Sequence, residues 1–93
     1  MSPNEGNYRV QVAGSARRDL RRLPGKIAAA IIEFITGPLA ENPQRLSRPL
    51  RGELADYRSA RRGDYRVLFR IDHDRHTILI AALNHRAHIY RPR

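Results

Sequence analysis

The sequence predicts an α+β domain in the order β-α-α-β-β-β, with two N-terminal helices packed on one face of a small, mainly antiparallel sheet. Helical periodicity is confined to the first half of the chain, and the second half alternates apolar and polar residues at period two. The dipeptide Gly63-Asp64 is suited to a tight turn between two strands. The 93 residues are enough for one modest core and too few for two.

The first half of the chain is predicted to form one strand and two helices. Residues 1–7 are polar and expected to be disordered, so the single domain covers residues 8–93. Residues 8–12 alternate as a half-buried strand does, and Ser15 is expected to N-cap the short helix that follows. A second helix begins near Lys26, and its core face consists of Ile27, Ile31, Phe34 and Ile35. Gly37-Pro38 is expected to kink or interrupt this helix, because proline lacks a backbone donor, although residues 39–42 can add another turn before Pro43.

The second half is predicted to be β structure after an ordered basic loop at residues 44–52. Strands are expected at about residues 53–61, 65–72 and 77–84, with a short last strand at 87–90. On the middle strand, Val67 and Phe69 face the helices, so the opposite face presents arginine. Residues 78–83 are apolar on both sides, as in a central strand, which predicts that the arginine face is a lined groove.

Composition favours an anionic partner. The chain has 18 Lys+Arg against 9 Asp+Glu, a net charge of +9, and only one lysine, Lys26. Such a field attracts nucleic acid, an acidic protein or both, and the planar guanidinium fork of arginine binds phosphate bidentately. The absence of cysteine excludes disulfides, thiolate metal sites and cysteine nucleophiles. No apolar stretch has the length of a signal peptide or a membrane span, so a cytoplasmic location is expected.

The candidate site is a cluster of basic and aromatic residues from the β segments. The tight turn brings Arg61 and Arg66 together on adjacent strands, and Arg86, His88 and Tyr90 share a face if the chain stays extended. This combination suits RNA, whose 2′-OH can attack the adjacent phosphate without a metal. The arginines would stabilise charge on the phosphate, His88 or His85 would transfer protons, and Tyr90 would stack on a base.

Other patterns have simpler explanations. The arginines of the first helix are expected to form a solvated face. His73 and His76 flank a turn but lack further ligands at suitable spacing, and no nucleophile motif surrounds Ser59. We therefore expect no metal and no cofactor.

Residues 61–67, together with His85-Arg86 and Tyr90, resemble the RelE/ParE superfamily of bacterial toxins from type II toxin–antitoxin systems, and the RelE branch more than the ParE branch. The resemblance covers nearly the whole chain. It implies the RelE-like fold and a ribosome-dependent endoribonuclease that cuts messenger RNA and is neutralised by an acidic, RelB-like antitoxin. It also implies that Arg66 contacts the scissile phosphate, that Arg86 is a second catalytic arginine and that Tyr90 stacks.

Two features of the chain leave alternatives open. Ser59 stands where the best-known members of the family have a lysine, so the general base is not identified, and His88 is one candidate. Arg61 is at a position that is often basic in the family. Further RNA contacts are expected from Arg58, Arg62, Arg70 and His85.

Two other functions compete with RNA cleavage. A ParE-like protein on the same fold would inhibit DNA gyrase without catalysis and would not need Arg66, Arg86 and Tyr90 on one face. A simple basic nucleic-acid-binding module is the third possibility, for which the low aromatic content offers little stacking surface.

Overall fold

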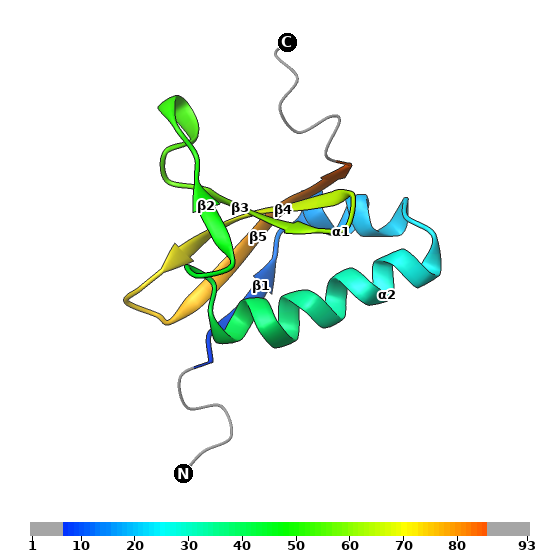
Figure 1. Ribbon diagram of the computed structural model, residues 1–93, viewed down its shortest axis with the longest axis horizontal. Helices are drawn as coiled ribbons and strands as arrows, with labels where there is room; N and C mark the ends of the chain where they lie inside the picture. Colours follow the sequence, from blue (N-terminus) through cyan, green and yellow to red (C-terminus); the bar gives the residue numbers. More distant parts are fainter. Residues whose placement is uncertain (1–6, 86–93) are drawn as a thin grey trace.

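The structure is a computed structural model that describes residues 7–85, so the predicted last strand at 87–90 and all but the last residue of segment 1–7 lie outside the described residues. Figure 1 shows one layer of helix against a twisted sheet. The elements, in chain order, are β1 (Arg9–Val12), α1 (Gly14–Arg21), α2 (Gly25–Phe34), the π-helical segment η1 (Ile35–Leu39), β2 (Ser47–Pro49), the 3₁₀ turn η2 (Gly52–Leu54), β3 (Arg58–Arg62), β4 (Tyr65–Asp72) and β5 (Thr77–His85).

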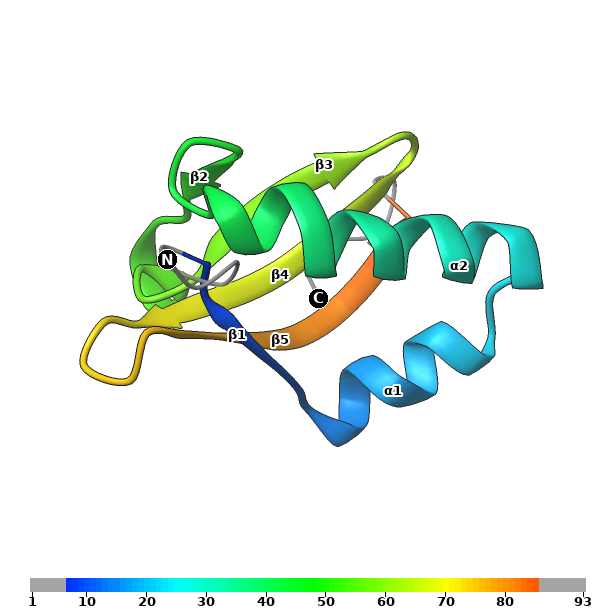
Figure 2. The same ribbon diagram turned by 90° about the horizontal axis from the view of Figure 1, so that it is seen from below.

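The sheet has five strands in the order β1-β5-β4-β3-β2. β1 runs parallel to β5, and the other three pairings are antiparallel. The predicted α+β class is therefore confirmed, as is the interior position of the apolar strand β5, which lies between β1 and β4. α2 crosses one face of the sheet, and α1 lies alongside β5 (Figure 2).

The core lies between α2 and the sheet face that carries Val67 and Phe69. Both side chains are fully buried, as expected from the alternation of β4. α2 contributes Ile31, and η1 continues the same apolar face with Ile35 and Leu39. The core face predicted from helical periodicity is therefore confirmed, and the opposite face of β4 carries Arg66, Leu68 and Arg70.

Pro38 changes the helix without ending it. α2 runs directly into η1, where the wider π-helical turn contains Pro38. A π-turn is one of the ways in which a helix accommodates the missing N–H of proline and the steric clash of its ring with the preceding turn. The predicted interruption of the α-helix is therefore confirmed, since regular α-helix ends at Phe34, and the π-helical turn that follows keeps Leu39 in the core.

The sequence did not predict β2, and it predicted the start of β3 too early in the chain. β2 has only three residues, which is too few to show a period-two pattern. It is an edge strand that pairs with β3 alone, so the missing N–H of Pro49 is tolerated there. Residues 52–54, predicted as loop and strand, form η2 instead.

α1 covers the edge of β5 that extends beyond β1. β1 pairs only with Thr77–Ile80, and the backbone groups of the next residues face α1. The Ser15 hydroxyl donates to the Ala81 carbonyl (2.6 Å), and the Leu83 N–H donates to the Asp19 carboxylate (2.9 Å). Ser15 is therefore not the N-cap that we predicted. The N-cap position is occupied by Ala13, without a side-chain cap bond, because the Ser15 hydroxyl is used in tertiary contact.

We expect Asp19→Ala to lower the free energy of unfolding by about 1–3 kcal/mol, because the half-buried Leu83 N–H loses its acceptor. Asp19→Asn keeps an amide oxygen at the same place and should cost less. Urea denaturation of both variants measures the difference. Equal losses would show that the carboxylate acts through its charge and not as the acceptor of this bond.

Candidate functional site

The β3–β4 hairpin brings two predicted site residues together. Its loop consists of Gly63 and Asp64, and the register places Arg61 directly opposite Arg66. Gly63 has φ of +62°, whereas Asp64 is not among the residues with positive φ. A two-residue loop with positive φ only at its first position matches the type II′ turn that favours glycine there. The predicted pairing of the two arginines is confirmed.

We expect Gly63→Ala to destabilise the protein by about 1–2 kcal/mol through backbone strain, because an L-residue disfavours positive φ. An added Cβ meets no atom within 4 Å, so a clash does not contribute. Gly37→Ala is the matched control, since a Cβ there also meets nothing and alanine favours helix. Thermal unfolding should show opposite shifts for the two variants, and a stabilising effect of Gly63→Ala would contradict the assigned strain.

Arg61 and Arg66 line a pocket of about 400 Å³ between β2, β3 and β4. The pocket is also lined by Arg45, Leu46, Ser47, Arg48 and Ser59. Four arginines thus surround one hollow, and none of the residues that line it is acidic. We call these seven residues the arginine pocket. Its charge and size fit an anionic group of up to about nucleotide size.

Ser59 is the buried polar residue of the arginine pocket. It is 5% exposed, and its hydroxyl has no hydrogen-bond partner among the described residues. The register pairs it with Arg48 on β2 and with Leu68 on β4. A buried hydroxyl without a partner costs free energy, and a ligand group that accepts its hydrogen bond would remove this cost.

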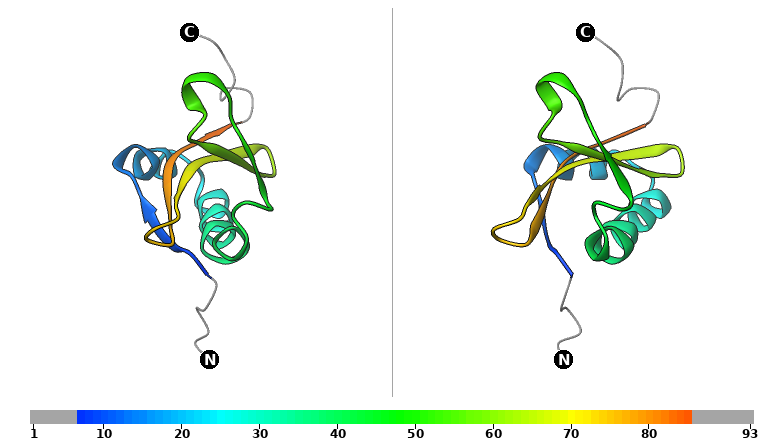
Figure 3. Two further views of the ribbon diagram at one scale, coloured as in Figure 1. Left: turned by 90° about the vertical axis from the view of Figure 1, so that its left-hand side faces the viewer. Right: turned by 60° about the vertical axis from the view of Figure 1, so that its left-hand side comes forward.

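The segment between β2 and β3 rises from the sheet on the side opposite to α2, as Figure 3 shows. Backbone bonds keep this segment ordered: the Leu50 N–H donates to the Tyr57 carbonyl, and the Tyr57 N–H donates to the Leu54 carbonyl. The segment therefore stands beside the sheet face that carries Arg66. The pocket that Arg61 and Arg66 line agrees with the prediction that this face is hollowed and not flat.

The other residues that we predicted to contact RNA do not line the arginine pocket. Arg70 follows Arg66 at period two and shares its face, further along β4. The register places Arg58, Arg62 and His85 on the alternate face, together with Tyr65 and Val67. Their role in RNA binding stays a prediction. Arg86, His88 and Tyr90 lie outside the described residues.

Arg58 holds β2 in place. Its Nε donates to the Ser47 hydroxyl (2.7 Å), and its Nη2 lies 3.2 Å from the Gln44 carbonyl and 3.3 Å from the Ser47 carbonyl. The Ser47 hydroxyl in turn donates to the Pro43 carbonyl (2.6 Å). This network fixes the segment that carries Arg45 and Arg48. Its described contacts therefore give Arg58 a positioning role.

His85 contacts an aromatic ring at the end of the hairpin. The centroids of the Tyr65 and His85 rings are 5.3 Å apart, in an edge-to-face arrangement. This contact ties the end of β5 to β4, at the point where the chain continues toward Arg86.

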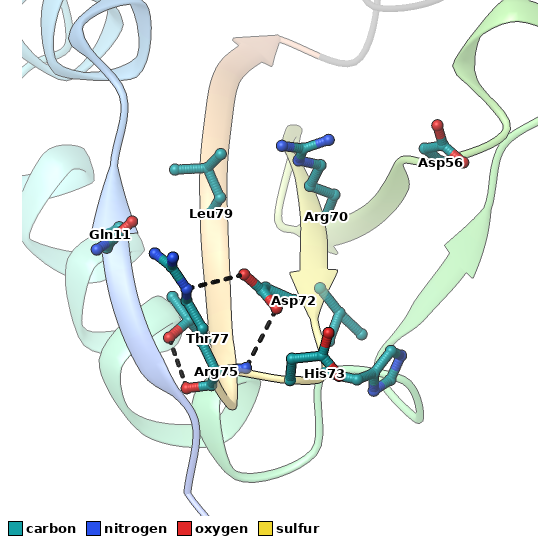
Figure 4. A pocket seen from close by; sticks show the side chains of 10 residues that line it. Gln11, Asp56, Arg70, Asp72, His73, Arg75, Thr77 and Leu79 are labelled. Carbon is teal, nitrogen blue, oxygen red and sulfur yellow. Dashed lines mark hydrogen bonds and ion pairs between the residues drawn. The ribbon is translucent and has the colours of Figure 1, made fainter.

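A larger pocket, of about 690 Å³, lies at the opposite end of β4 and β5 (Figure 4). It is lined by Gln11, Asp56, Arg70, Ile71, Asp72, His73, Asp74, Arg75, Thr77 and Leu79. Its three carboxylates outnumber its two arginines, and Asp72 already accepts a bond from the Arg75 N–H (3.2 Å). This mixture of charges suits a polyanion less well than the arginine pocket does.

Arg45 and Arg48 were not predicted to belong to the site. Both were assigned to a basic loop, because the strand that orients Arg48 is too short to be recognised from its pattern. The only signal in the sequence was the high density of arginine at residues 45–51.

Residues 10–90 match the family described as the ParE toxin of the type II toxin–antitoxin system parDE. The chain belongs to this toxin family. The toxin is 51% identical over 84 residues to two proteins of Mycobacterium tuberculosis (strain ATCC 25618 / H37Rv), Toxin RelE and Toxin RelG. Each alignment covers 90% of this chain, with 87% of Toxin RelE and 97% of Toxin RelG.

Solved structures agree with the fold of the toxin. The M. tuberculosis toxin–antitoxin complex RelBE2 contains a chain that is 49% identical, with a TM-score of 0.84, over 87% of this chain and 93% of that one. The isolated E. coli RelE toxin has a TM-score of 0.70 at 15% identity, over 84% and 83% of the two chains, and shows the shared fold alone. In the described part of the toxin, no helix is both long and apolar enough to cross a membrane.

Proposed function

We propose that this toxin is a ribosome-dependent endoribonuclease that cleaves messenger RNA and so inhibits translation in the cytoplasm. The observation that carries the proposal is the arginine pocket, in which Arg61 and Arg66 lie opposite each other on the hairpin and none of the lining residues is acidic. The two relatives at 51% identity are named RelE and RelG toxins, which supports the RelE branch.

The chemistry needs no metal. The ribose 2′-oxygen attacks the adjacent phosphorus, the bond to the 5′-oxygen of the next nucleotide breaks, and the products are a 2′,3′-cyclic phosphate and a 5′-hydroxyl. The proton of the 2′-OH goes to a base, and the leaving oxygen takes up a proton. Arg61 and Arg66 stabilise the extra negative charge on the phosphate, because guanidinium groups remain protonated and donate in a fixed fork.

The proposal also includes residues beyond the described part of the chain. Arg86 would supply a further cation, His88 or His85 would transfer a proton, and Tyr90 would stack on a base of the cleaved codon. Ser59 replaces the family's lysine inside the arginine pocket, so proton transfer in this chain would depend on the histidines.

We further propose an acidic, RelB-like antitoxin as the partner that neutralises this toxin. The net charge of +9 favours an acidic segment. Related structures from M. tuberculosis, E. coli, Methanococcus jannaschii and Pyrococcus horikoshii are toxin–antitoxin complexes of RelE and RelB proteins.

The second candidate function is non-enzymatic inhibition of DNA gyrase. It is favoured by the family match, which is to the ParE toxin description. Brief expression followed by primer extension separates the two functions. Codon-phased cuts that disappear in Arg66→Ala support the nuclease, whereas growth arrest with intact transcripts and accumulated DNA breaks would overturn it in favour of gyrase.

A further inference from the structure

The arginine pocket is wider than one phosphate needs, and its polar groups are arranged in two rows. The register across β3 and β4 places Arg61 opposite Arg66 in the first row. The second row contains Arg48, which is opposite Ser59 across β2 and β3. Because Ser59 and Arg61 are two residues apart on one strand, the rows are separated by roughly 6–7 Å. This is close to the spacing of successive phosphates along an RNA strand.

We propose that Arg48 and Ser59 bind the phosphate next to the scissile one, so that the arginine pocket holds two successive phosphates of the messenger RNA. The inference rests on the proposed nuclease function. It adds a second phosphate subsite to the arginine pair and assigns it to residues from β2 and β3.

The buried Ser59 hydroxyl, which lacks a hydrogen-bond partner among the described residues, supports a ligand in the second row. Ser59 is buried and lines the pocket. A phosphate oxygen would accept a hydrogen bond from this hydroxyl and relieve the cost of its burial. Arg48 on β2 lies directly opposite Ser59 on β3 and is exposed, so its guanidinium group can reach the same phosphate.

Charge supports phosphate over a neutral ligand. Arg45 adds a cation at the side of the pocket formed by the segment before β2, and none of the lining residues is acidic. The Arg58 network holds this segment against β3 before any ligand arrives. The second row is therefore preorganised, which lowers the entropy cost of binding.

The test uses ribosomes programmed with messenger RNAs in which single phosphates beside the cut are replaced by uncharged methylphosphonates. Single-turnover cleavage is measured for the wild-type toxin, Arg48→Ala and Ser59→Ala. For the wild type, replacement of one neighbouring phosphate should slow cleavage about tenfold to a hundredfold, the range expected from loss of a charge-assisted bond. Arg48→Ala should be slowed by a similar factor on unmodified RNA and become insensitive to that same replacement.

Ser59→Ala provides a second readout. It should slow cleavage of unmodified RNA by roughly two- to tenfold while leaving thermal stability equal to or above that of the wild type, because it removes a buried hydroxyl without a partner. A structural serine would instead destabilise the fold when replaced. Arg21→Ala, which removes an equal charge from exposed α1, is the matched control and should cleave as the wild type does.

The outcomes separate the inference from the function on which it rests. If the wild type does not cut unmodified messenger RNA, the proposed function fails. If the wild type cuts, but Arg48→Ala stays as sensitive as the wild type to each methylphosphonate, the second subsite is overturned. It is likewise overturned if Arg48→Ala and Ser59→Ala weaken only binding of an acidic antitoxin and leave cleavage unchanged, because the pocket then serves a protein ligand.

Discussion

Arg66→Ala is expected to slow messenger RNA cleavage by about 10²–10³-fold, the usual effect of removing one preorganised donor to a developing oxyanion. Arg66 is partly buried on β4, opposite Arg61, and lines the arginine pocket. In such a site, water cannot replace the lost guanidinium with the same orientation. Single-turnover cleavage on programmed ribosomes measures the effect on the chemical step.

Two control variants make this result specific. Arg66→Lys keeps the charge but loses the planar fork, so its rate should fall between those of the wild type and Arg66→Ala. Arg21→Ala on α1 tests the loss of one positive charge away from the pocket and should leave the rate unchanged. If Arg66→Ala cleaved within a few-fold of the wild-type rate, Arg66 could not be a principal transition-state donor.

Phe69→Ala is expected to lower the free energy of unfolding by about 3–5 kcal/mol, because it removes a large side chain from a packed core and leaves a cavity. Phe69 is fully buried on the core face of β4 and belongs to the cluster with Ile31, Val67 and Ile80. A domain of this size has a total stability of about 5–15 kcal/mol, so much of it would be lost. The midpoint of thermal unfolding should fall by about 10–40 °C.

The matched control for this prediction is Leu54→Ala. Leu54 lies on η2 and is 45% exposed, so its removal should change stability by only about 0.5 kcal/mol. A similar drop in both variants would show that Phe69 is not part of a tightly packed core. Only the folded toxin holds Arg66 of β4 in the arginine pocket. The Phe69→Ala variant should therefore lose cleavage activity in proportion to the fraction of protein that is unfolded.

Local sequence patterns were sufficient to predict the helices and strands that are long enough to show a helical or a period-two pattern of apolar residues. The helical segment formed by α2 and η1 showed its core face through Ile31 and Ile35, and β4 showed both of its faces through eight alternating residues. The tight Gly63-Asp64 loop determines the register of β3 on β4, so the sequence alone predicts that Arg61 lies opposite Arg66.

The sequence-based predictions were wrong where the pattern of neighbouring residues was weak or where a tertiary contact overrode it. β2 has only three residues, too few to show the period-two pattern of a strand. Ser15 has the chemistry of an N-cap, yet its hydroxyl bonds to Ala81, which is 66 residues away in the chain. Neither outcome is visible in a window of neighbouring residues.

The amino-acid sequence by itself determined the α+β class, the basic character of the protein and the arginine pair on the hairpin, because these depend on composition, short-range periodicity and turn geometry. Only the tertiary structure decided that Arg45, Arg48 and Ser59 join this pair in one pocket. The reason is that β2 acquires its position by pairing with β3 across an intervening segment and by the bonds of Arg58, and three residues carry no periodic signal of that pairing.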